Sequence, residues 1–124
     1  MSQQLRRIGK MENKICTSLE QSKKLLELGV DINTADMCYR IVAYNPNNTH
    51  VYQPYCFIGT LESDIPAWSL SALFSILPKS ARLEKGSSTE LYRVSLPVEL
   101  KGSDWYLDPM DAVFEAYCLL NRTN

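Results

Sequence analysis

The sequence has a single histidine and only five glycines, and it contains none of the short motifs in which these residues bind nucleotides or metals. The phosphate-binding patterns G-x-x-x-x-G-K-[ST] and G-x-G-x-x-G are absent. The zinc-hydrolase pattern H-E-x-x-H and the nucleophile-elbow pattern G-x-S-x-G are absent as well. Each pattern supplies the backbone geometry or the ligand spacing that its chemistry needs, so their absence excludes nucleotide cradles and zinc hydrolases.

Excess charge of one sign and long apolar runs are also missing. The chain has 13 Lys and Arg against 14 Asp and Glu, a formal net charge of -1, so it lacks the general attraction that polyanion binders use. No stretch approaches the ~18 apolar residues of a membrane span, and residues 1–10 are polar and basic, unlike a signal peptide. We therefore expect a cytoplasmic protein with no membrane partner.

The cysteines show neither a disulfide framework nor metal-ligand spacing. None of them forms a C-x-x-C pair, and the chain offers only His50 as a histidine ligand. In a reducing compartment such cysteines stay reduced. We expect four free thiols, no metal site and no other cofactor. The four cysteines are Cys16, Cys38, Cys56 and Cys118.

The chain does have the make-up of one small folded domain. Of its 124 residues, 45% are apolar and 10% aromatic, which is enough for a single core at this length. Residues 1–14 hold four basic side chains against one acidic one and few aliphatics. We expect a flexible basic tail over residues 1–14 and a single globular α+β domain over residues 15–124.

One helix and a strand pair are predicted in the first half. The capping box Thr17-Ser18-Leu19-Glu20 predicts the start of a helix that ends at Gly29. Residues 37–44 are apolar on both faces, which is typical of a central strand, and residues 55–58 form a second short strand after a long loop.

The second half predicts two helices around a hairpin. A helix capped by Asp64 or Ser63 runs to Pro78, and residues 79–89 are a surface loop. Strand 91–96 pairs with residues 105–107, and Asp108-Pro109 starts the last helix. The predicted fold is α+β in the order α-β-β-α-β-β-α, with one antiparallel sheet of about four strands and the helices on one face. The side chains expected to be most buried are Trp68, Leu73, Leu77, Val113, Phe114 and Tyr117.

Three segments resemble a family of small proteins, without an established activity, that prophages and mobile elements of anaerobic gut bacteria carry. The segments are Ala35-Asp36-Met37, the run Asp64-Ile65-Pro66-Ala67-Trp68-Ser69-Leu70-Ser71-Ala72-Leu73 with Ile76-Leu77-Pro78, and Asp108-Pro109-Met110-Asp111-Ala112-Val113. The resemblance covers roughly residues 11–120 and implies a phage-related setting, but no reaction.

A cysteine-dependent enzyme is one alternative that the residues leave open. It would need His50 within hydrogen-bond reach of Cys38 or Cys56, with the thiol pKa lowered. Free cysteines in helices and strands are more often small buried hydrophobes. Asp108 and Asp111 could pass for paired catalytic carboxylates, but helix capping explains both more simply. We therefore expect no enzymatic activity.

The loop over residues 44–55 is the strongest candidate for a binding surface. It combines tyrosines with a histidine and two asparagines, as recognition surfaces do, although tyrosines also simply cover sheet edges. The predicted partner-binding residues are Tyr52 and Tyr55, with Tyr44 and His50 at the rim.

The sequence thus favours a non-enzymatic accessory or protein-interaction module of a phage or mobile element, and it leaves a homodimer open. The runner-up is a protein that touches nucleic acid through the basic tail. The tail residues that would do so are Arg6, Arg7, Lys10 and Lys14.

Overall fold

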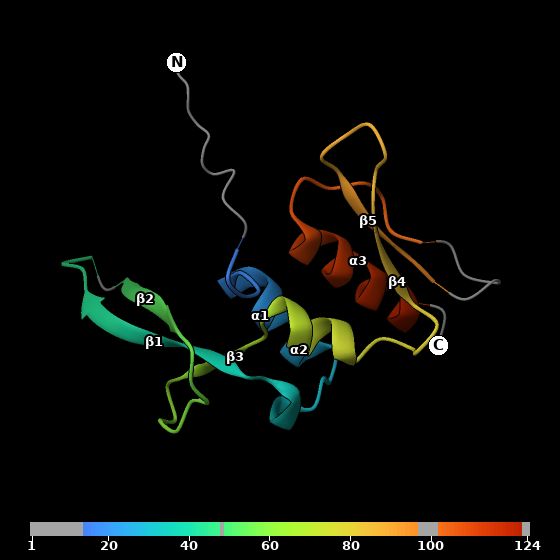
Figure 1. The fold of residues 1–124 in the computed structure, drawn as a ribbon. Helices are drawn as coiled ribbons and strands as arrows, with labels where there is room; N and C mark the ends of the chain where they lie inside the picture. The colour runs from blue at the N-terminus through green and yellow to red at the C-terminus, as the bar shows by residue number, and fades with distance from the viewer. Residues whose placement is uncertain (1–13, 48, 97–101, 123–124) are drawn as a thin grey trace, which may run out of the picture. The chain divides into compact units, whose positions relative to one another are not determined.

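The computed structural model describes residues 14–47, 49–96 and 102–122, and within them the chain is an α+β protein (Figure 1). The predicted class and the general order of elements are confirmed. In chain order, the described elements are α1 (Leu19–Glu27), the 3-10 turn η1 (Ile32–Thr34), β1 (Met37–Tyr44), β2 (His50–Tyr55), β3 (Ile65–Ala67), α2 (Leu70–Ser75), β4 (Arg82–Lys85), β5 (Tyr92–Ser95) and α3 (Pro109–Arg122).

The described residues group into two compact units, with the boundary inside α2. The first unit is Cys16–Leu73 and holds α1, η1, β1, β2 and β3. The second holds β4, β5 and α3, together with Lys14 and Ile15. The single domain over residues 15–124 stays a prediction.

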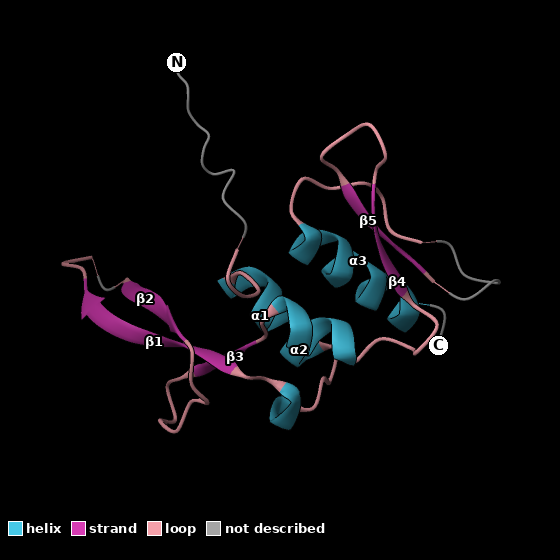
Figure 2. Cartoon of the chain, in the orientation of Figure 1, coloured by secondary structure: helices cyan, strands magenta, loops and turns pink. Residues whose placement is uncertain are grey.

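The prediction of one sheet of about four strands is wrong, because the described strands form two antiparallel sheets (Figure 2). The first has the order β2-β1-β3, so both edges of β1 are occupied and no later strand can join there. The second pairs β4 with β5, and Tyr92 of β5 also forms a bridge with Tyr106. The helices therefore do not share one sheet face: α1 packs against β3, and α3 packs against β5.

The first helix begins one residue later than the sequence suggested. Ser18 is the N-cap, and its Oγ accepts from the Gln21 backbone N–H at 3.1 Å while its own N–H donates to Gln21 Oε1 at 2.9 Å. The prediction that Thr17 caps the helix is wrong. Thr17 is fully buried, and its Oγ1 accepts a hydrogen bond from the Trp68 backbone N–H at 3.2 Å. The predicted end is confirmed: Gly29 follows the helix with a φ of 83°, the left-handed region that favours glycine.

The helix expected from Asp64 to Pro78 begins later, at Leu70, and ends at Ser75. Residues 65–67 instead form β3, which pairs with Met37–Tyr39 of β1. Pro66 fits there because β3 is an edge strand, in which a missing N–H is tolerated. Ser69 supplies the cap, since its Oγ accepts from the Ala72 N–H at 3.1 Å.

The core of the first unit forms between α1 and β3. Trp68 is fully buried, and its indole N–H donates to Thr34 Oγ1 at 2.9 Å. Leu25 and Leu73 are also fully buried, as are Cys38 and Ala67 in the sheet. The predicted burial of Trp68 and Leu73 is confirmed.

In the second unit, the prediction of a surface loop over residues 79–89 is wrong, because Arg82–Lys85 forms strand β4. Glu84 lies opposite Arg93 in the β4–β5 ladder, and the two side chains form an ion pair at 3.1 Å. A cross-strand ion pair of this kind stabilises a strand even where its composition is polar, as in the segment that the sequence suggested to be a loop. The hairpin expected between strand 91–96 and residues 105–107 is reduced to the Tyr92–Tyr106 bridge.

Helix α3 starts where the sequence places it. Asp108 Oδ1 accepts from the Met110 N–H at 2.8 Å, and Pro109 occupies the first helical position. Val113 and Leu77 are buried as expected, but Phe114 and Tyr117 are only half-buried. The helix instead buries five other positions, two of them alanines. The buried α3 positions are Pro109, Met110, Ala112, Val113 and Ala116.

Candidate functional site

The segment expected to be a long loop is mostly a strand. β2 runs from His50 to Tyr55 and pairs with β1 over almost its whole length, so the strand predicted at residues 55–58 is wrong. The turn formers occupy a tighter connection, in which the Asn45 N–H donates to the Thr49 carbonyl at 2.9 Å. Asn45 and Asn47, which suggested a loop, are thus confined to the hairpin tip, and Asn48 lies outside the described residues.

Three of the four predicted contact residues come together on one face of this β1–β2 hairpin. Tyr44 lies directly opposite His50 in the ladder, and their ring centroids are 4.9 Å apart with the planes at 85°. His50 and Tyr52 alternate onto the same face of β2, with ring centroids 6.2 Å apart and planes at 84°. Tyr44, His50 and Tyr52 form the aromatic row. Edge-to-face contacts of this kind hold the rings in a defined orientation.

Exposure along the aromatic row differs from the expected order. Tyr44 is 71% exposed and His50 is exposed, whereas Tyr52 is half-buried beside Ile41, its partner in the ladder. Tyr44, which was expected at the rim, therefore exposes more surface than Tyr52, which was expected to be a main contact.

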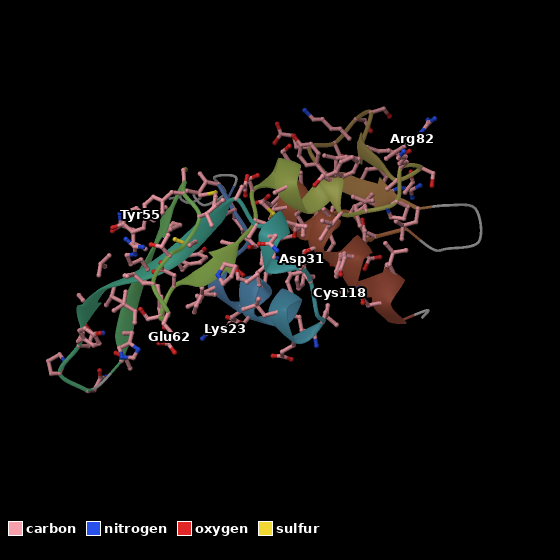
Figure 3. All side chains as sticks on the ribbon, turned by 90° about the horizontal axis from the view of Figure 1, so that it is seen from below. Lys23, Asp31, Tyr55, Glu62, Arg82 and Cys118 are labelled. Carbon is pink, nitrogen blue, oxygen red and sulfur yellow. The ribbon has the colours of Figure 1, made fainter. Side chains whose placement is uncertain are left out.

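Tyr55 (labelled in Figure 3) lies on the other face of the hairpin, since it is three residues from Tyr52 in the same strand. Its ring stacks on Phe57, with centroids 5.2 Å apart and planes at 28°. The Arg40 guanidinium lies 4.9 Å from the centre of the Phe57 ring. This second cluster includes Phe57, which the sequence reasoning missed and which strand alternation would have indicated once β2 was placed.

Beyond Arg40, the hairpin and the segment that follows it lack charge. Residues 41–61 contain no Asp, Glu, Lys or Arg, in a chain in which 22% of residues are charged. Large apolar side chains are exposed along the same stretch, and contiguous exposed apolar surface marks interaction sites on monomers. These exposed residues are Val42, Tyr44, Val51, Phe57, Ile58 and Leu61.

An ion pair fixes the base of the hairpin. Arg40 donates twice to Asp64, from Nε to Oδ1 at 2.9 Å and from Nη2 to Oδ2 at 2.7 Å. Asp64 also accepts from the backbone N–H groups of Thr60 and Leu61. The Arg40 hydrogen bond is the main reason that the pKa of Asp64 falls to about 2. Gly59 packs so closely here that an added Cβ would lie 2.7 Å from the Asp64 Cβ.

The structure does not bring the histidine to a cysteine. Cys38 lies opposite Tyr55, while His50 lies at the other end of β2, about 17 Å away for five residues at ~3.3 Å each. Burial is the main cause that raises the thiol pKa values of Cys38 and Cys16, which is the opposite of nucleophile activation. Cys56 follows Tyr55 at the same far end of β2, so the structure does not place His50 beside either of the two thiols that the sequence singled out. None of the four cysteines, all of which lie in the described residues, forms a disulfide bond.

A concave site exists in the first unit, with a volume of about 500 Å³, but it contains neither His50 nor a cysteine. Its walls are mainly aliphatic, and its charged members are acidic. The apolar lining residues include Leu26, Ile32, Met37, Ile58, Leu61 and Pro66.

Only Lys14 of the basic tail lies within the described residues. Its Nζ donates to Asp111 Oδ1 at 2.6 Å, and its backbone N–H donates to Asp108 Oδ2 at 2.9 Å. This charge is thus already paired at the start of α3. The other predicted tail residues, Arg6, Arg7 and Lys10, lie outside the described residues.

Comparisons with known proteins add no relative. A scan against protein-family models gave no match, and searches of curated proteins and of solved structures also gave none. No helix in the described part of the chain is long and apolar enough to cross a membrane. Residues 14–47, 49–96 and 102–122 hold no group of three or more His, Cys, Asp or Glu side chains placed to bind a metal ion.

Proposed function

We propose that this chain is a non-enzymatic protein-interaction module whose contact surface is the aromatic row of the β1–β2 hairpin. The observation that carries the proposal is the contact of Tyr44, His50 and Tyr52 on one hairpin face, within a segment free of charged residues. Tyrosine rings offer a large contact area at a small cost in conformational entropy, because they have few rotatable bonds.

The pre-set geometry of the row supports this role. The Tyr44 and Tyr52 rings both meet the His50 ring edge to face, and the Arg40–Asp64 pair holds the base of the hairpin. A partner would therefore meet rings that are already ordered, which lowers the entropy lost on binding. An uncharged surface of this kind suits the apolar centre of an interface, from which charged residues are depleted.

The setting in which the module acts is proposed from the sequence resemblance. The segments in which we see a resemblance to prophage and mobile-element proteins include the start of α3 and the stretch that forms β3 and α2. We infer that the chain is an accessory protein of such an element that works inside the host cell through a protein partner.

The test is a pull-down from cells that carry the element, with the full chain as bait. The Tyr44→Ala, Tyr52→Ala double variant is expected to recover at least about tenfold less partner, since central tyrosines each contribute on the order of 1–2 kcal/mol. Tyr44→Ala alone, at a highly exposed side chain, separates lost contact from lost stability. Tyr55→Ala, on the opposite face, is the matched control and should recover the partner fully. Undiminished recovery by the double variant, or a loss confined to Tyr55→Ala, would refute the proposed surface.

A further inference from the structure

The outer edge of β2 is the least protected strand edge among the described residues. β2 is an edge strand of the sheet β2-β1-β3, so its outer backbone groups pair with no other described strand. Such an edge is a ready template for another strand, and proteins normally blunt it with short length, charge or proline.

The other described edges show those protections. β4 carries charged residues at three of its four positions, Arg82, Glu84 and Lys85. β3 is only three residues long and includes Pro66. The outer edge of β5 is partly covered, because Tyr92 forms a bridge with Tyr106 and the Val94 carbonyl accepts from the Ser103 N–H at 2.9 Å. β2 is six residues long and carries no charge, and its one protective feature is Pro54 near the end. The stretch from His50 to Gln53 is therefore open to pairing.

We propose that β2 pairs antiparallel with β2 of a second copy of this chain, which joins two three-stranded sheets into one. Absence of charge favours a second copy as the occupant. In a two-fold contact the same residues approach one another from both sides, so a charged edge would repel itself. Residues 41–61 carry no charge, so nothing opposes the approach of an identical edge.

The pairing has a consequence for the aromatic row that rests on the proposed function. Antiparallel pairing about a two-fold axis keeps the same face of both sheets on one side, so the two rows would lie on a continuous surface. A partner with two binding sites would then meet both rows at once, and its affinity would rise through effective concentration. Since a four-residue edge is small, the dimer should be weak and depend on concentration.

The first experiment measures the mass of the full chain by sedimentation over a hundredfold range of concentration. The wild type should move from monomer toward twice the monomer mass. Val51→Lys places a charge on the edge at a side chain that is 38% exposed, and it should stay monomeric. Ile32→Lys, which adds the same charge at an exposed aliphatic residue of the same unit, should dimerise like the wild type. Circular dichroism checks that each variant is folded.

A charge-swap experiment makes the test specific. Gln53→Glu also adds charge to the edge, on the same face as Val51 and beside Arg40 in the ladder, so folding should be retained. Each charged variant should be monomeric alone, and an equimolar mixture of Val51→Lys and Gln53→Glu should restore dimers, because the two edges then attract.

Several outcomes would overturn the pairing. They are a wild type that stays monomeric throughout, a Val51→Lys variant that dimerises as strongly as the wild type, or a mixture that stays monomeric. A monomeric wild type that still loses its partner through the Tyr44→Ala, Tyr52→Ala change would reject the pairing and leave the proposed function standing. A wild type that dimerises, but whose partner recovery is unchanged by the Tyr44→Ala, Tyr52→Ala substitutions, would support the pairing and reject the proposed function.

Discussion

The Arg40–Asp64 pair gives the fold a stability that depends on pH. The Asp64 side chain is only 2% exposed and accepts hydrogen bonds from Arg40 and from two backbone N–H groups. These bonds favour the charged carboxylate, so the folded protein binds the Asp64 proton more weakly than the unfolded chain does, with a pKa of about 2 in place of 3.8. The stabilisation is complete above about pH 4 and is lost as the pH falls through about 2.

The size of the effect follows from that difference. Each pKa unit corresponds to about 1.4 kcal/mol, and the Arg40 side chain is 29% exposed, so solvent screens part of the interaction. We expect Asp64 ionisation to contribute about 2 kcal/mol to the free energy of unfolding at neutral pH. Asp64→Asn removes the charge with little change of shape, and it should lower the stability by about that amount at pH 7.

The assay is urea unfolding of wild type and Asp64→Asn at several pH values between about 7 and 2. The difference in unfolding free energy should stay constant down to about pH 4 and then shrink, because the wild type becomes protonated and resembles the variant. Glu62→Gln, at an exposed carboxylate two residues away, is the matched control and should change stability by less than about 0.5 kcal/mol. A difference that does not vary with pH, or one no larger than that of the control, would refute the argument.

Three further predictions concern single positions. Gly59→Ala should destabilise the protein by about 1–3 kcal/mol in urea unfolding, because its Cβ would lie 2.7 Å from the Asp64 Cβ; a neutral effect would contradict this packing. A thiol reagent should react first with the exposed Cys56 and slowly with the buried Cys16 and Cys38, and it should count four thiols in denaturant. Labelling of Cys16 and Cys38 as fast as that of Cys56 in the folded state would contradict their burial. Asp108→Ala should cost about 1 kcal/mol of stability through the lost cap of α3, and an unchanged urea midpoint would show that the cap is dispensable.

The sequence predicted elements best where a local signal acts alone. The cap at Asp108 and the stop at Gly29 were found because each depends on its own backbone conformation. The start of α1 was one residue off because two capping boxes overlap, at Thr17 with Glu20 and at Ser18 with Gln21. The choice between them depends on Trp68, whose backbone N–H binds the Thr17 hydroxyl across 51 residues of chain. No local pattern contains that contact.

The sheet was mispredicted for the same reason. The residues before Trp68 read equally well as a capped helix start, with Asp64 as the cap and Pro66 in the first turn. Asp64 is instead occupied by Arg40, which lies 24 residues earlier in the chain, and this pair places residues 65–67 beside β1. A three-residue strand has no periodicity of its own to detect. Once it occupies the second edge of β1, the two halves of the chain form separate sheets.

The candidate site shows how one shift in register changes a functional prediction. Treated as a loop, residues 44–55 gave Tyr52 and Tyr55 as joint contacts, because a loop imposes no face on its side chains. In a strand the side chains alternate, so Tyr52 and Tyr55 point to opposite faces, while Tyr44 joins Tyr52 through the ladder pair with His50. A partner that covers one face of the hairpin can thus contact Tyr44, His50 and Tyr52 together, but it cannot contact Tyr55 in the same way. For this reason Tyr55→Ala is the control and not the test of the proposed surface.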